Sequence, residues 1–371
     1  MSEERLVERF VRLCEIPSIT DDEREVTDAI AAELGELGIE FREDDAAEPA
    51  RAGAGNLIAT IPGREGAEGF ISFFAHVDTV PHHEPIRVVD DAGVLRSAGD
   101  TILGADNKAA VTVLMELGAG LIAEPGPIGV ELIFTVAEEQ GLRGAAALDA
   151  SALQSECGFV LDHATPIGEV ITASPTYKKI VAEFRGVEAH AGIRPEAGRS
   201  AIEAASAAIA TMDLGRLDEE TTANIGTIGG GSAPNVVAGL CRIEAEARSV
   251  EAGKAEETAQ RMVDTCTWAA GERGLDVDVM VETYFRGYRI KPTSRPLAMA
   301  RAGLERCGIE PREVTTGGGS DANALRAGGF DALLLANGTE ANHTSDESVA
   351  ISELVRMLDV CRAIVEEAPA C

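Results

Sequence analysis

The first part of the chain has the hydrophobic pattern of amphipathic helices. Apolar residues recur every three or four positions from Glu3 to about Leu37, and this spacing places them on one face of a helix. The pattern breaks near Thr20, and the acidic stretch 21–25 that follows is a typical helix start and cap. The sequence therefore predicts two helices in this segment.

The next segments alternate between strand and helix patterns. Residues 54–63 and 69–80 concentrate β-branched and aromatic side chains between turn signals, which is typical of strands. Residues 108–124 form an apolar run long enough for a buried helix, and 130–140 have the pattern of another strand. A strand, a helix and a strand in this order predict a parallel sheet.

The pattern changes between Thr176 and about Tyr288, where three strands and two helices alternate. This order predicts a β-α-β-α-β unit with its own sheet. We expect the strands at 179–186, 241–250 and 275–285 and the helices at 199–213 and 253–274.

After Arg295 the chain returns to a helix, a glycine-rich loop at 315–323, a strand and a final helix. We interpret this part as the completion of the first domain after an insertion. The predicted fold is α/β, with a mostly parallel sheet. Its first domain spans residues 1–174 and 289–371, and a smaller α+β domain spans 175–288.

The composition of the chain limits its size class and the partners that it can bind. With 371 residues, 45% of them hydrophobic, the chain can bury one large core and a smaller one. Acidic residues outnumber basic ones 63 to 32, and the formal charge of −31 repels phosphate backbones and anionic lipids. We therefore expect neither nucleic acid nor a membrane as a partner. The acidic excess fits either a surface suited to high salt or an ordinary acidic protein kept soluble by its charge.

Two further features indicate the compartment. The first ten residues lack an apolar core of signal-peptide length, and no later apolar run is long enough to span a bilayer. The seven cysteines are an odd number, are scattered and form no CxxC pair. We expect them to be small buried hydrophobes in a reducing compartment, which predicts a cytoplasmic protein.

Histidines and carboxylates recur at the ends of the predicted strands. His76 and Asp78 lie two apart at the end of one strand, so their side chains point to the same side. The other candidates end strands or follow them in loops, where ligand sites of α/β proteins form. They are Asp106, Glu138, Glu139, Asp162 and His343. Two histidines and three carboxylates at one sheet edge suit paired zinc, cobalt or manganese ions.

Each signal also has a simpler interpretation. Asp106 precedes a predicted helix and would serve equally as its N-cap. His163, His82 and His83 compete as ligands, but we expect them to support the ligands or to face solvent. The ordered combination of the motifs, rather than any one of them, favours a metal site.

The motifs AHVDTV, GADNKAA, VAEEQG, LDH, EAHAG and NHTS occur in this order, and the chain resembles the M20 family of metallopeptidases over nearly its whole length. GADNKAA, EAHAG, GGGSDAN and HTSDE are most similar to the peptidase T (tripeptide aminopeptidase) branch. The resemblance implies a di-metal catalytic domain interrupted by a lid domain that forms a homodimer. It also implies hydrolysis of an amide bond in a small peptide, with two zinc ions per subunit, or cobalt or manganese in their place.

The resemblance also assigns the metal ligands. It implies that Asp106 bridges the two ions, that His76 and Asp162 complete one site, and that Glu139 and His343 complete the other. A carboxylate bridge holds two cations a few ångströms apart, which acidifies a shared water and polarises the scissile carbonyl.

The remaining roles follow from the same resemblance. Glu138 would be the base, which takes a proton from water and delivers it to the leaving amine. Asp78 would accept the ring N–H of His76 and fix its tautomer. In the lid, His190 would donate to the oxyanion, where otherwise it would be an ordinary surface histidine. Asn224 and Arg248 lie where the family places substrate contacts, although Arg248 would otherwise be a salt-bridge partner. Apart from the resemblance, the glycines at 317–319 either let a main chain approach a ligand or make a turn, and we expect Gly318 to contact substrate.

The chain departs from the peptidase T pattern at two positions beside the bridging carboxylate. Asn107 stands where that branch usually has aspartate, and Ala110 stands where glycine is common. Neither is expected to ligate metal. The chain is also somewhat short for a tripeptide aminopeptidase. The alternatives are therefore an N-acyl amino acid deacylase or carboxypeptidase of the same family and, outside this class, a metal-binding dimer without catalysis.

Overall fold

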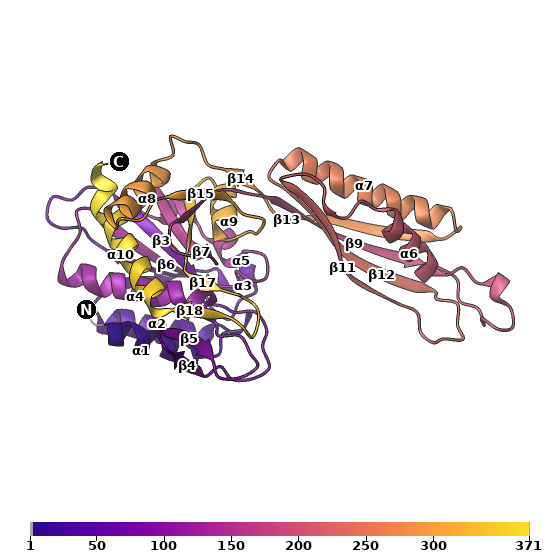
Figure 1. Ribbon diagram of the computed structural model, residues 1–371, viewed down its shortest axis with the longest axis horizontal. Helices are drawn as coiled ribbons and strands as arrows, with labels where there is room; N and C mark the ends of the chain where they lie inside the picture. Colours follow the sequence, from indigo (N-terminus) through magenta and orange to yellow (C-terminus); the bar gives the residue numbers. More distant parts are fainter. Residues whose placement is uncertain (1–2, 371) are drawn as a thin grey trace. The chain divides into compact units, whose positions relative to one another are not determined.

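The computed structural model describes residues 3–370, which divide into two compact units. Unit 1 contains residues 1–172, 290–315 and 320–371, and unit 2 contains 173–289 and 316–319 (Figure 1). The sequence analysis places 316–319 in the first domain, whereas in the structure these four residues belong to unit 2.

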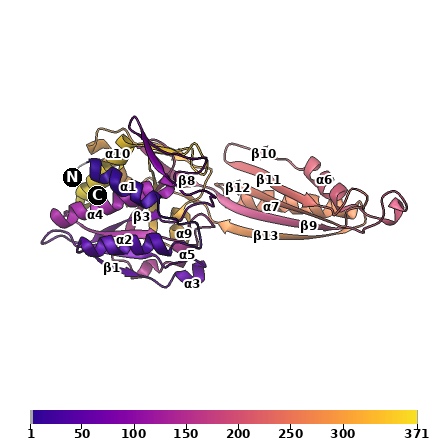
Figure 2. The same cartoon turned by 90° about the horizontal axis from the view of Figure 1, so that it is seen from below.

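A mixed sheet forms the centre of unit 1 (Figure 2). Its strands follow the order β1 (Glu40–Glu43), β2 (Leu57–Ile61), β6 (Gly129–Thr135), β3 (Phe70–His76), β7 (Cys157–His163), β16 (Asp331–Ala336) and β8 (Glu169–Ser174), with β15 (Arg312–Thr315) beside β8. The two-residue strand β14 (Tyr288–Arg289) pairs with the last two residues of β8 within unit 2. The four strands from β6 to β16 are parallel, as predicted, and the outer strands pair antiparallel.

Helices cover this sheet, and the longest of them is nearly all buried. Helix α4 (Ala105–Ala123) packs against β3, α1 and α10, which explains why its apolar run has no polar face. Its regular geometry begins after Asn107, because Asp106 and Asn107 have non-helical backbone angles and a cis peptide bond between them. The other helices of unit 1 are α1 (Glu3–Cys14), α2 (Arg24–Glu36), α3 (Ala47–Ala50), α5 (Arg143–Ala147), α8 (Arg295–Arg306), α9 (Asp321–Ala327) and α10 (Ile351–Glu367), with short 3-10 turns η1 (Ala150–Ala152) and η3 (Ala368–Ala370).

A small antiparallel sheet completes unit 1, in the order β17 (Thr339–Glu340), β18 (Ser348–Ala350), β5 (Val94–Ser97) and β4 (Val88–Asp91). Two local predictions were wrong. The carboxylate of Glu23 does not cap α2, because it accepts main-chain N–H groups from other segments. The expected loop 315–323 contains β15's last residue and the start of α9, so only its middle is irregular.

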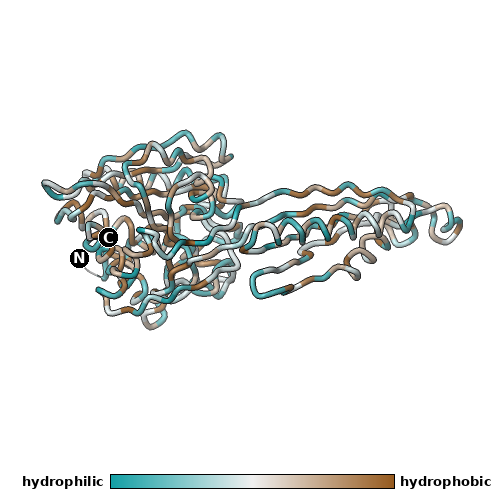
Figure 3. The backbone as a smooth tube through the Cα atoms, turned by 90° about the horizontal axis from the view of Figure 1, so that it is seen from above, coloured by the Kyte–Doolittle hydropathy of each residue, from teal (hydrophilic) through white to brown (hydrophobic). Residues whose placement is uncertain are grey.

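Unit 2 is a five-stranded antiparallel sheet in the order β10 (Gly215–Arg216), β11 (Thr221–Gly230), β12 (Leu240–Ser249), β9 (Thr176–Arg185) and β13 (Asp276–Phe285). Helices α6 (Ala201–Thr211) and α7 (Ala252–Gly271) pack on one face, and the turn η2 (Pro195–Ala197) precedes α6. Hydropathy alternates along its long strands (Figure 3), because every second side chain faces the helices. Strand β11 was not predicted, because its glycines and exposed polar residues do not give the alternation of apolar and polar side chains that is typical of a strand.

The structure bears on two further expectations, that the cysteines are buried and that no segment spans a membrane. Six cysteines are free, and five of them are buried, whereas Cys307 is partly exposed. Cys371 lies outside the described residues. Between residues 3 and 370, none of the helices combines the length and apolar character that crossing a bilayer requires.

Candidate metal centre and active site

The candidate residues of unit 1 gather at the carboxyl edge of the parallel strands. His76 is the last residue of β3, and Asp162 is the penultimate residue of β7. Glu138 and Glu139 lie in the turn after β6, which ends at Thr135, earlier than the sequence pattern indicates. Because β6, β3 and β7 are parallel neighbours, their carboxyl ends converge at one place.

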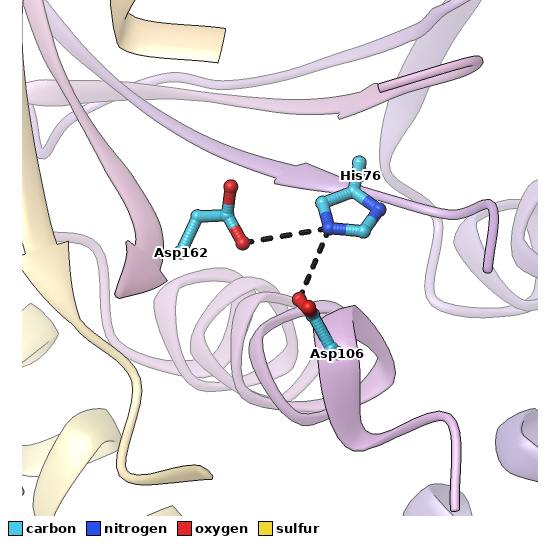
Figure 4. Close-up of side chains that lie close together, drawn as sticks. All are labelled: His76, Asp106 and Asp162. Carbon is cyan, nitrogen blue, oxygen red and sulfur yellow. Dashed lines mark hydrogen bonds and ion pairs between the residues drawn. The ribbon is translucent and has the colours of Figure 1, made fainter. Parts of the chain in front are cut away.

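One group of ligand atoms surrounds the imidazole of His76 (Figure 4). Its Nε2 lies 3.2 Å from Oδ1 of Asp106 and 3.4 Å from Oδ1 of Asp162. Asp106 comes from the first turn of α4, so three separate elements contribute to this group. His76 is buried, with 2% of its side chain exposed, which keeps the group out of bulk water.

A second group shares Asp106. Its other oxygen, Oδ2, lies 3.1 Å from Nε2 of His343, and the same nitrogen lies 3.0 Å from Oε1 of Glu139. His343 follows β17, has a positive φ of 65° and is half exposed. The two oxygens of Asp106 therefore face two different histidines. A carboxylate that bridges two cations needs this arrangement.

The donor set fits divalent cations. Ligand atoms of three groups each lie within 4.8 Å of one another: His76, Asp106 and Asp162; His76, Glu138 and Glu139; and Asp106, Glu139 and His343. Imidazole nitrogen and carboxylate oxygen are the ligands that zinc and its first-row neighbours accept.

The electrostatics of the centre agree with this fit. Burial raises the pKa of Asp162 to about 8 and raises the pKa of Glu138 well above its usual range. Hydrogen bonds with Asp106 and Glu139 raise the pKa of His343 to about 10. Although burial acts in the opposite direction, the contacts with His343 and His76 lower the pKa of Asp106. Burial thus favours the protonated forms of Asp162 and Glu138, and a bound cation would favour their ionised forms.

Asp78 holds the turn that carries the two glutamates. Its Oδ1 accepts the main-chain N–H of Glu138 at 3.0 Å, and its Oδ2 accepts that of Glu139 at 3.2 Å and the hydroxyl of Thr20 at 2.7 Å. Nδ1 of His76 lies 3.0 Å from the main-chain oxygen of Asp78 and 3.5 Å from its Oδ1. The main-chain oxygen is therefore the nearer partner of the ring.

Two residues that support this centre had no assigned role in the sequence analysis. Glu23 is buried and accepts the N–H of Gly53 at 2.6 Å and of Ala137 at 3.2 Å, so it fixes the residue before Glu138. The amide of Asn107 donates to the main-chain oxygen of Leu161 at 2.8 Å and to Oδ1 of Asp162 at 3.3 Å. Asn107 is noticeable in the sequence as a departure from a motif, whereas Glu23 carries no local signal.

The competing histidines lie outside the ligand groups of residues 3–370. His163 lies 3.7 Å from Glu169, and burial lowers its pKa. Nδ1 of His82 contacts the main-chain oxygen of Glu84, and His83 is exposed in the same loop.

The candidates of unit 2 lie on its own elements. His190 is exposed in the loop after β9, and Asn224 is exposed on β11. The guanidinium of Arg248 on β12 stacks over the ring of Tyr177, 4.3 Å from its centre.

The remaining contacts of Arg248 are polar. Its nitrogens donate to Glu246 at 2.8 Å and to the main-chain oxygen of Gly317 at 3.0 Å, next to Gly318. The side chain of Arg248 therefore has partners within unit 2.

Comparison with known proteins identifies both regions. Residues 173–273 match the model of the peptidase dimerisation domain of M20 enzymes, and residues 56–173 match the model of peptidase family M28. The chain is 39% identical to the uncharacterized protein YqjE of Bacillus subtilis (strain 168), over 99% of both chains.

Two solved structures are similar over their full length. The aminopeptidase PepT from Bacillus cereus ATCC 10987 is 38% identical with a TM-score of 0.89, and the match covers 100% of this chain and 99% of that one. A tripeptidase from Staphylococcus aureus subsp. aureus Mu50 is 32% identical with a TM-score of 0.93, and the match covers 100% of both chains. The chain therefore belongs to the M20 family of metallopeptidases, in its peptidase T-like branch.

Proposed function

We propose that this metallopeptidase is an aminopeptidase that hydrolyses short peptides, tripeptides among them, with two zinc ions per subunit. The observation that carries the proposal is the carboxylate of Asp106, which turns one oxygen toward His76 and the other toward His343. Asp162 would complete the first metal site and Glu139 the second. The aminopeptidase and tripeptidase activities named for the two solved relatives support the choice of substrate.

When bound, two such cations would polarise the scissile carbonyl and acidify water in the site. Glu138 is the base of this proposal. Burial, and then the nearby charge of Asp162, raise the pKa of Glu138 well above its usual range, which makes its carboxylate a stronger base than that of an exposed glutamate. It takes a proton from the attacking water and delivers it to the leaving amine. Asp78 positions Glu138 and Glu139 through their main-chain N–H groups.

Unit 2 would supply the contacts to substrate. His190 is exposed and has a ring nitrogen available to donate to the oxyanion, and Asn224 is exposed on the same unit. Arg248 would hold a terminal carboxylate bidentately after exchanging its contact with Glu246. Gly318 would let the main chain approach the ligand closely, because glycine has no side chain.

The proposal includes a homodimer formed through unit 2, supported by the match of residues 173–273 to the dimerisation model. A cytoplasmic location is supported by the free cysteines and the acidic composition.

The test is hydrolysis of a tripeptide, the same tripeptide N-acetylated, and an N-acetyl amino acid, each after chelation and again with zinc or cobalt restored. Metal-dependent cleavage of the free tripeptide alone supports the aminopeptidase. Cleavage of only the acylated compounds would replace it with a deacylase, and cleavage of none of them would favour a binding protein without catalysis.

A further inference from the structure

A buried carboxylate outside the proposed mechanism lies directly behind the bridging aspartate. Glu347 is four residues after His343, and 1% of it is exposed. Its Oε2 accepts the main-chain N–H of Leu103 at 2.8 Å and of Gly104 at 2.9 Å, and its Oε1 accepts that of Asp106 at 2.8 Å. One side chain therefore binds three N–H groups of a single loop.

Within residues 3–370, these three N–H groups have no main-chain acceptor. The first N–H groups of a helix have no partner within the helix. Here the entry to α4 is buried, with Leu103 fully covered, so water does not replace a partner. Gly104 has a φ of 74°, and Asp106 has non-helical angles, so the helix itself does not fix this conformation. The carboxylate of Glu347 is what holds it.

The short segment 343–347 thus contacts both the side chain and the main chain of Asp106. Residue 343 contributes an imidazole that contacts Oδ2 of Asp106, and residue 347 contributes the carboxylate that anchors the Asp106 main chain. We propose that Glu347 is the positioning residue of the bridging carboxylate: it fixes the main chain of Asp106 so that its two oxygens face His76 and His343. This inference rests on the proposed function, since it assigns Asp106 to two cations.

A glutamine at position 347 would not accept all three N–H groups that the carboxylate of Glu347 accepts. Glutamine has the same shape but a single acceptor oxygen, and its other terminal atom is an NH2 donor. If the amide oxygen stays with Leu103 and Gly104, the NH2 group faces the N–H of Asp106. In the flipped orientation it faces the other two. Either way at least one buried N–H loses its partner, and the loop shifts.

The chain offers a matched control. Glu131 on β6 is also buried, with 2% exposed, and its carboxylate accepts the main-chain N–H groups of Gln154 and Ser155 and the Ser155 hydroxyl. It belongs to none of the three ligand groups found among residues 3–370. Glu131→Gln therefore makes the same chemical change to the same kind of contact away from the centre.

The experiment compares wild type, Glu347→Gln and Glu131→Gln. Zinc or cobalt alone is titrated into each metal-free protein against a competing chelator, thermal unfolding is followed without metal, and kcat and KM are measured for a tripeptide at saturating metal. Supporting groups around metal ligands change metal affinity or activity by about 10- to 100-fold. We expect Glu347→Gln to lose about 10-fold or more in metal affinity and in kcat, with little change in KM. Glu131→Gln should lose thermal stability alone.

Equal metal affinity of the two variants, with a wild type that binds metal and cleaves peptide, would overturn the positioning role and leave the proposed function standing. A wild type that binds no metal would overturn both. If Glu347→Gln does not fold, Glu347→Asp and Glu131→Asp serve the same comparison, because aspartate keeps the charge but is one methylene too short. Loss of metal affinity only at position 347 then supports the role, and equal affinities contradict it.

Discussion

Asp321 allows the electrostatics of the metal-free centre to be tested by one substitution. It is 1% exposed at the start of α9, and its Oδ2 accepts the hydroxyl of Thr135. Within residues 3–370, its Oδ1 has no hydrogen-bond partner. Burial raises the pKa of Asp321 from 3.8 to about 6, and the charge of Asp78 adds to the effect. Asp321 in turn helps to raise the pKa values of the already buried Glu138 and Asp162.

The sign of the effect follows from proton linkage. Below pH 3.8 both the folded and unfolded states hold the proton, so Asp321 then has no charge to bury. As the pH rises toward and through 6, the unfolded chain releases the proton more readily, and folding loses stability. The loss is on the order of 3 kcal/mol above both pKa values. Asparagine keeps an oxygen for Thr135 and removes the charge, so Asp321→Asn should stabilise the metal-free protein at neutral pH.

The assay is thermal unfolding of wild type and Asp321→Asn in excess chelator at pH 4.5 and pH 7.5, because bound cations would change these pKa values. For a folding unit of this size, 1 kcal/mol corresponds to about 2 to 4 °C in Tm. The variant should therefore gain about 6 °C or more over wild type at pH 7.5 and markedly less at pH 4.5. A difference that is the same at both pH values would refute the reasoning.

Three further substitutions test separate parts of the structure. Glu138→Ala should retain metal, measured by elemental analysis, and lose nearly all turnover, because only the proton carrier is removed; unchanged turnover would contradict the base assignment. Gly158→Ala should destabilise the fold by about 1 to 3 kcal/mol, since its Cβ would lie 2.7 Å from the main-chain oxygen of Ser72 on the neighbouring strand. Gly271→Ala should stabilise by about 0.4 to 1 kcal/mol, because an added Cβ would meet no atom of residues 3–370 within 4 Å beyond the adjoining main chain of its own helix. Denaturant unfolding checks both glycine variants, and equal effects would contradict the packing argument.

The sequence predicts the central elements because their signals are local. Strand β3 and helix α4 are mostly apolar runs, and they are nearly all buried in the structure. Strand β11 was not predicted, because its pairing with β12 is made by main-chain groups while its side chains are largely exposed. The four-residue strand β1 is likewise fully exposed along its length. Hydrophobic periodicity carries no information about such strands.

The candidate ligands were predictable for a different reason. His76 and Asp162 lie at the ends of parallel strands, and the parallel arrangement brings them to one edge whatever their distance in sequence. The supporting carboxylates follow no such rule. Glu347 is separated by 241 residues from Asp106, and Glu23 by 114 from Ala137. Each is recognised only by the main-chain N–H groups that the fold places around it.

The buried carboxylates around the candidate metal centre include two sets with different roles. Glu23, Asp78 and Glu347 accept main-chain N–H groups, and the segments that they bind, 137–139 and 103–106, are those that carry Glu138, Glu139 and Asp106. The proposed ligands instead contact histidines or one another. The contacts of the first set hold the segments that carry the ligand atoms, which lie within 4.8 Å of one another in each group. By fixing this main chain, the first set would reduce the ordering that metal binding itself has to supply.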